Sequence, residues 1–129
     1  MEIKILRVLD PGLGAVEFTC PAGHAWGFWK GDEEATVGVF HVELEISEPI
    51  SAWLPPSYPH AQIKGEYGED AQGVTISGTV ERVDEDCVIS FRIQSDVVLL
   101  ETSQAAQKVT QGDFVAFTTC ALELYPYEL

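Results

Sequence analysis

Residues 73–95 read GVTISGTVERVDEDCVISFRIQS, and this stretch predicts a β-hairpin. Apolar and polar residues alternate along 74–83 and again along 87–94, as they do in strands with one buried and one wet face. The two runs are joined by a short acidic segment that is typical of a turn between antiparallel strands. The side chains expected to point inward in the second run are Cys87, Ile89, Phe91 and Ile93.

The same alternation extends toward the N-terminus. Residues 37–47 place Val42 and Leu44 on one face and acidic residues on the other. Residues 2–9 and 15–20 flank DPGLG, whose Pro and Gly residues have strong turn chemistry, and they predict a second hairpin. The segment WLPPSYP, residues 53–59, is too rich in proline for a central strand and is expected to form a loop or an edge.

Toward the C-terminus the pattern is less regular. The apolar run DVVLLE, residues 96–101, predicts a strand buried on both faces or a continuation beyond a bulge. Residues 102–109 have capping and helix-favouring residues and predict one short helix. The run FVAFTTCALELY, residues 114–125, predicts the longest strand of the chain, ending before Pro126.

Many short strands at regular spacing predict an all-β fold, either a small antiparallel β-barrel or a β-sandwich. The 129 residues fit one β domain, 1–129. The placement of the helix just before the last strand pair resembles a small OB-type barrel, and this resemblance covers residues 73–125.

The chain is expected to be soluble and cytoplasmic. Its start has neither the apolar run nor the cleavage site of a secretory signal. No window approaches the roughly 18 apolar residues that a membrane span requires. Cys20, Cys87 and Cys120 form an odd set without repeated spacing, which favours reduced thiols over a disulfide framework.

The formal net charge is -14, and the acidity is unevenly placed. Residues 1–30 hold three basic and three acidic side chains, so all of the net charge lies in residues 31–129. Such a charge repels phosphate backbones and anionic lipids and attracts basic surfaces, although it also serves solubility. We therefore expect no direct nucleic-acid contact and no membrane contact, and a basic protein as partner.

Residues 20–32, CPAGHAWGFWKGD, hold the densest group of chemically capable side chains. Cys20 and His24 could supply two ligands, whereas a zinc ion needs three or four. Cys20 precedes Pro21 and does not begin a helix that could activate its thiol. We expect no metal, no cofactor and no enzymatic activity, and we read the stretch as a strand with aromatic residues on both faces.

These observations predict a non-enzymatic interaction protein that binds a basic partner through its acidic surface, such as an inhibitor or immunity protein against a toxin nuclease. Two alternatives stay open: a small-ligand or metal-binding barrel, and a subunit of a homo-oligomer. The predicted partner-binding residues are Asp32, Glu33, Glu34, Asp84, Glu85 and Asp86, with Trp26 or Trp29 as aromatic anchor. The residues predicted to line the alternative ligand pocket are Trp26, Trp53, Tyr58 and His60.

Overall fold

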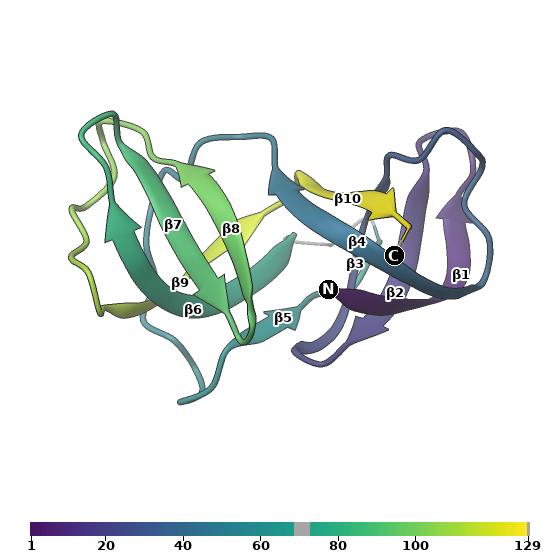
Figure 1. The fold of residues 1–129 in the computed structure, drawn as a ribbon, viewed down its shortest axis with the longest axis horizontal. Helices are drawn as coiled ribbons and strands as arrows, with labels where there is room; N and C mark the ends of the chain where they lie inside the picture. Colours follow the sequence, from purple (N-terminus) through teal and green to yellow (C-terminus); the bar gives the residue numbers. More distant parts are fainter. Residues whose placement is uncertain (69–72, 129) are drawn as a thin grey trace.

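The computed structural model describes residues 1–68 and 73–128, and within them the chain forms ten β-strands and no helix. The all-β prediction is therefore confirmed. The strands make two lobes side by side along the long axis of the molecule (Figure 1). Since the described residues include no helix, they include none long and apolar enough to cross a membrane.

The first lobe is a closed five-stranded barrel in the order β1-β2-β3-β10-β4. β10 is parallel to β3 and antiparallel to β4, and β4 returns to β1. With β10 counted as the fifth strand, this is the order of an OB barrel, a five-stranded Greek-key design. The strand bounds are β1 Glu2–Asp10, β2 Ala15–Cys20, β3 Gly23–Trp29, β4 Gly38–Ile46 and β10 Leu122–Tyr127.

The second lobe is a five-stranded sheet inserted between β4 and β10. Its order is β5-β6-β7-β8, and β9 pairs along β6. Ile50 and Leu54 add isolated bridges to Thr102 and Ala116, so the chain before β5 runs across the open side of the sheet. The strand bounds are β5 Gln62–Lys64, β6 Val74–Val83, β7 Val88–Ile93, β8 Asp96–Glu101 and β9 Phe114–Thr119.

Alternating apolar side chains fill the two lobes with one continuous hydrophobic core. In the barrel, Val16 and Phe18 of β2 are fully buried. In the second lobe, the rings of Trp53, Phe91 and Phe117 contact one another, with centroids 5.5 to 6.0 Å apart. This spacing is typical of aromatic pairs that stabilise a core.

The lobes are joined where the start of β3 meets β5. The Ile63 amide donates to the Ala22 carbonyl at 3.0 Å, and the Gly65 amide donates to the His24 carbonyl at 3.2 Å. Gly23 lies between these two bonds with φ +146°, and a Cβ there would collide with the Ile63 carbonyl oxygen. Only glycine permits this approach of the two backbones.

The hairpin predicted at residues 73–95 is confirmed as β6 and β7, with Ile89, Phe91 and Ile93 buried. Cys87 was expected to point inward, but it is exposed and has φ 63°, because it belongs to the turn that precedes β7. The hairpin predicted around DPGLG is confirmed as β1 and β2.

Four predictions for the C-terminal half of the chain are wrong. Residues 102–109 form a turn instead of a helix, in which the Ala106 amide donates to the Ser103 carbonyl. Residues 114–125 are not one strand, since β9 ends at Thr119, the chain bends at Cys120 and it continues as β10 in the other lobe. β10 also extends through Pro126, which pairs with Val42. Finally, the OB-type barrel is formed by β1–β4 and β10 instead of residues 73–125.

Candidate protein-binding groove

A groove of about 620 Å³ lies where β4 of the barrel passes β8 of the second lobe. Its walls come from residues 43–48 on one side and 96–101 on the other, with Met1 and Tyr127 at its margin. Alternation within the strands decides which side chains face inward. Leu44, Val98 and Leu100 turn into the core, whereas their neighbours turn outward.

The groove is strongly acidic. None of the described residues that line it is Lys or Arg. Of its carboxylates, Asp96 lies 3.1 Å from the amino group of Met1, and Glu48 accepts hydrogen bonds from the Thr119 hydroxyl and the Cys120 amide. Within residues 1–68 and 73–128, none of them pairs with a Lys or Arg side chain. The groove carboxylates are Glu43, Glu45, Glu48, Asp96 and Glu101.

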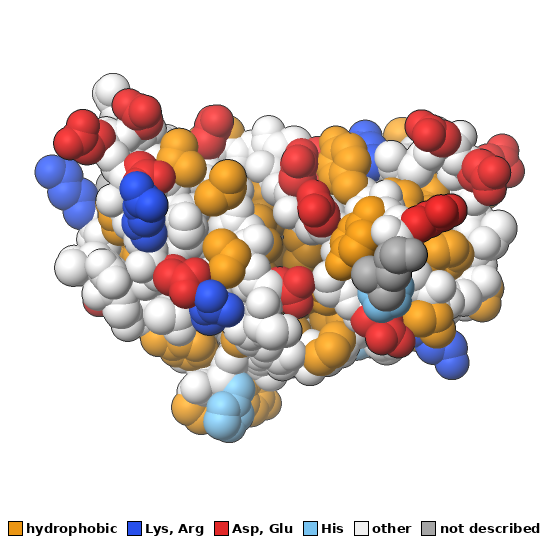
Figure 2. All heavy atoms as spheres, viewed as in Figure 1, with side chains coloured by type: hydrophobic (Ala, Val, Ile, Leu, Met, Phe, Trp, Pro, Cys, Tyr) orange, Lys and Arg blue, Asp and Glu red, His pale blue; other side chains and the backbone are white. Residues whose placement is uncertain are grey.

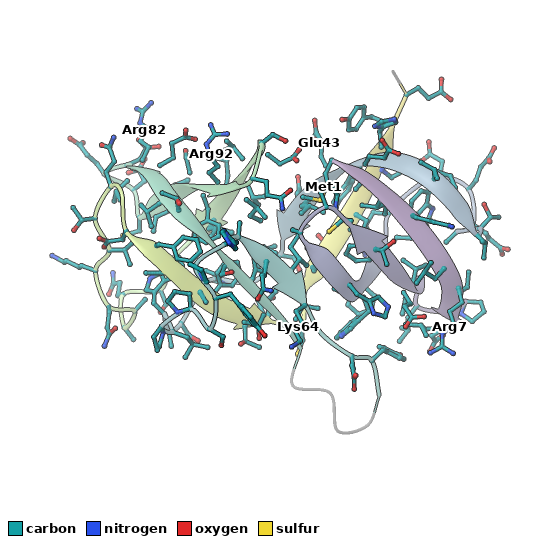
Figure 3. All side chains as sticks on the ribbon, turned by 90° about the horizontal axis from the view of Figure 1, so that it is seen from below. Met1, Arg7, Glu43, Lys64, Arg82 and Arg92 are labelled. Atoms are coloured by element: carbon teal, nitrogen blue, oxygen red, sulfur yellow. The ribbon has the colours of Figure 1, made fainter. Side chains whose placement is uncertain are left out.

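The pictures agree with this charge distribution. Figure 2 shows acidic side chains on both lobes around the hollow between them. In Figure 3, Glu43 and Met1 lie where the lobes meet, whereas Lys64 and Arg7 lie toward the opposite face. Arg92 is on the second lobe and is engaged by Glu81 at 2.6 Å. Among the described residues, the groove carboxylates are therefore not neutralised by contact with a Lys or Arg side chain, which favours a negative local field.

Exposed apolar side chains accompany the carboxylates. Val97 is 45% exposed and Leu99 is 66% exposed, both on the outer face of β8. Tyr127 of β10 is also exposed at the margin of the groove. Large exposed apolar side chains grouped in a concave, charged surface are typical of an interaction site. Of the two alternatives predicted for residues 96–101, burial on both faces is therefore wrong, since β8 is buried on one face only.

Tyr125 adds a neutral donor beside the acidic surface. It is paired with Glu43 in the β4–β10 ladder, and its hydroxyl donates to Glu123 Oε1 at 3.4 Å. Desolvation and the nearby carboxylates of Glu123 and Glu45 raise the pKa of this phenol. Tyr125 therefore remains protonated at neutral pH and contributes no charge.

The two acidic turns predicted to bind a partner lie in different lobes. Asp32, Glu33 and Glu34 are exposed in the loop between β3 and β4 of the barrel. Asp84, Glu85 and Asp86 form the β6–β7 turn of the second lobe, and Arg82 pairs with Asp84 at 2.8 Å. Figure 1 places these two segments at opposite ends of the molecule. The structure does not bring them together.

A third acidic segment includes Glu66, Glu69 and Asp70. Glu66 is exposed after β5. Glu69 and Asp70 lie outside the described residues.

Both predicted tryptophan anchors are packed against the barrel. Trp26 lies on the outer face of β3 but is only 6% exposed, because Tyr67 packs against its ring at 5.1 Å. Trp29 is half-buried against Phe40, and its Nε1 donates to the Glu33 carbonyl at 2.9 Å. In this arrangement neither ring stands free on the surface. The aromatic strand predicted for this stretch is present as β3.

The residues of the alternative ligand pocket are also separated. Trp53 is buried in the core of the second lobe. Tyr58 is exposed and borders a cavity of about 710 Å³ beside β5. His60 lines a different depression, next to Arg92 and Phe114. Trp26 lines yet another, of about 240 Å³, on the barrel.

Cys20 and His24 do not act as a pair. His24 Nε2 lies 3.1 Å from Glu17 Oε2, and Arg7 Nε lies 2.9 Å from the other oxygen of the same carboxylate. Cys20 is half-buried, and burial raises the pKa of its thiol, which opposes nucleophilic reactivity. Among the residues that the structure describes, no three His, Cys, Asp or Glu side chains are placed to hold a metal ion.

The groove could not be found from sequence, although its parts were visible. The alternation in residues 37–47 identifies Glu43 and Glu45 as surface residues, and the apolar run 96–101 identifies Val97 and Leu99 as unusual. The meeting of β4 with β8 is a tertiary contact between segments about fifty positions apart.

No protein-family model, curated protein or solved structure matches this chain.

Proposed function

We propose that the protein is a non-enzymatic interaction module that binds a basic protein partner in the groove between β4 and β8. The observation that carries the proposal is the composition of the groove: among the described residues that line it are five carboxylates and no Lys or Arg, next to the exposed side chains of Val97 and Leu99. Of these five, only Asp96 is paired with a cationic group in the described part of the chain, the amino group of Met1. Carboxylates attract and orient a basic surface, and apolar side chains that lose water on contact supply affinity.

Within this class, an inhibitor that blocks a basic enzyme is the most specific member. A cytoplasmic immunity protein that neutralises a toxin nuclease fits the net charge of -14, because a nuclease offers a basic surface to its own polyanionic substrate. An acidic groove competes with nucleic acid for that surface. Association is then fast at low salt and slower as salt screens the charges.

The test is site-specific photocrosslinking in the cells that make the protein. A photoreactive amino acid is placed at Val97 in the groove or, as the control, at Leu13 in the β1–β2 turn, which is also exposed. The proposal expects a basic protein to crosslink at position 97 and not at position 13. Capture of an acidic protein at position 97, or equal capture at both positions, overturns it.

The captured protein is then purified, and its association rate is measured with two triple variants of equal charge change. Glu43→Gln, Glu45→Gln and Glu101→Gln remove three charges from the groove. Asp32→Asn, Glu33→Gln and Glu34→Gln remove three charges from the β3–β4 loop. We expect the groove variant to slow association at low salt about tenfold or more and the loop variant to have a much smaller effect. Equal effects contradict the groove as the site.

A further inference from the structure

Within residues 1–68 and 73–128, the edge of β8 that faces the groove is unpaired at Val97 and Leu99. In antiparallel strands, the N–H and C=O of one residue point to the same edge, and successive residues alternate. The Thr102 amide donates to the Cys87 carbonyl on the β7 side, and the Glu101 carbonyl accepts from Ile50 on the other side. The N–H and C=O groups of even-numbered residues of β8 therefore point to β7, and those of odd-numbered residues point away from it.

The residues pointing to the free edge are Val97 and Leu99. β8 is the last strand of the path β5-β6-β7-β8, and β7 is its ladder partner. Within the described part of the chain, no hydrogen bond joins the N–H or C=O of Val97 or Leu99 to another group on that edge. In Figure 1, β7 lies along one side of β8, and β4 of the barrel lies beyond its other side.

An exposed edge of this kind can accept another strand by main-chain hydrogen bonds. The surroundings specify what that strand would contain. Its side chains would alternate between two directions. One set would lie on the inner face of the sheet, on the side of the buried Leu44 and Leu100, and the other would lie on the outer face beside Val97, Leu99 and Glu101. An extended segment that alternates apolar and basic residues fits both.

We propose that the partner binds by adding an extended basic segment to the free edge of β8, so that its backbone pairs with Val97 and Leu99. This inference rests on the proposed function for the identity of the partner. A second copy of this chain is a poorer occupant, because pairing two β8 edges would bring two sets of groove carboxylates together. The acidic groove thus selects a basic strand and disfavours self-association.

The first test uses the full chain and a defined probe, an amidated seven-residue peptide that alternates Lys and Val. Amide proton exchange at Val97 and Leu99 is followed by NMR. Both amides should exchange rapidly in the free protein and at least about tenfold more slowly with the peptide bound, because they become hydrogen-bonded. A peptide with Glu in place of Lys should give no protection. Equal protection by both peptides, or protection at other strands, contradicts the proposal.

Two variants then separate the backbone of Leu99 from its side chain. Leu99→Pro removes the N–H and places the proline ring where the added strand would pair. Leu99→Thr keeps the N–H and a strand-favouring side chain. We expect Leu99→Pro to weaken binding of the Lys-Val peptide about tenfold or more and Leu99→Thr to weaken it about threefold or less. Equal losses would mean that the side chain, and not the edge, is recognised.

The outcomes distinguish this inference from the proposed function. If binding of the captured basic protein depends on the groove carboxylates but is the same for Leu99→Pro as for the wild type, strand addition is wrong and the proposed function is supported. If Leu99→Pro abolishes peptide binding but no basic protein crosslinks in cells, strand addition at the β8 edge is supported and the proposed basic protein partner is wrong. A concentration-dependent dimer that Leu99→Pro abolishes would replace the basic partner with a second copy.

Discussion

At the scale of single residues, Cys20 shows how burial decides chemistry. The chain has three free cysteines, of which Cys87 and Cys120 are exposed and Cys20 is half-buried at the end of β2. Burial raises the pKa of the Cys20 thiol, only partly offset by hydrogen bonds from the backbone of Ala22 and Gly23. A raised pKa means that the folded protein holds the neutral thiol at a pH where a free thiol already ionises.

We expect iodoacetamide at pH 8 to alkylate Cys87 and Cys120 faster than Cys20, because the thiolate is the reactive form. The rate at Cys20 should rise steeply with pH, because burial raises the pKa of this thiol and keeps it neutral near pH 8. For the same reason, stability should fall as pH rises above about 8.5, where the unfolded thiol ionises more readily than the folded one. Mass spectrometry of the labelled peptides gives the rates, and guanidinium chloride should make them equal. Fast labelling of Cys20 in the folded protein would contradict this prediction.

At the scale of strands, the alternation of apolar and polar residues predicted well where strands lie and predicted poorly which remote segments they contact. The hairpins at residues 2–20 and 73–95 were predictable because strand, turn and strand are adjacent in sequence. The run 114–125 predicts one strand because its apolar pattern continues through a bend. At that bend the buried Thr119 hydroxyl donates to Glu48, a residue from a remote segment. The groove depends on such remote contacts, so no local pattern could reveal it.

The alternation of hydrogen bonds in β8 predicts opposite responses at neighbouring positions. Val98→Pro removes an N–H that points to β7 and replaces a buried side chain, which should cost about 3 kcal/mol or more. Leu99→Pro removes an N–H on the free edge, where proline is tolerated, and should cost about 1 kcal/mol or less. Urea unfolding of both variants measures the difference. Equal destabilisation would mean that the edge of β8 is not free.

At the scale of the whole molecule, the two lobes form one structure. The hydrophobic core is continuous between them, and backbone hydrogen bonds join β3 to β5. In addition, the second lobe begins and ends within the barrel, because β4 precedes it and β10 follows it. A lobe tied to the barrel at both ends cannot unfold without disturbing the strands that hold it.

We therefore expect the protein to unfold in one cooperative transition. Its tryptophans lie in both lobes, so the unfolding of each lobe can be followed separately. Trp53→Phe leaves the barrel tryptophans as probes, and Trp26→Phe with Trp29→Phe leaves the probe in the second lobe. Within each variant, the fluorescence and circular dichroism midpoints in urea should coincide. Gly23→Ala should lower the stability of both lobes together by about 2 kcal/mol or more, while Gly12→Ala, in an open turn, should have little effect. Separate midpoints would show that the lobes are independent.

The position of β10 has a consequence for synthesis on the ribosome. β10 closes the barrel between β3 and β4, yet the chain reaches it only after the whole second lobe. During translation β3 and β4 must wait, with unpaired edges and an open core, until residues 122–127 emerge. We therefore expect nascent chains of this protein to be most vulnerable to aggregation in the interval between the completion of β4 and the arrival of β10.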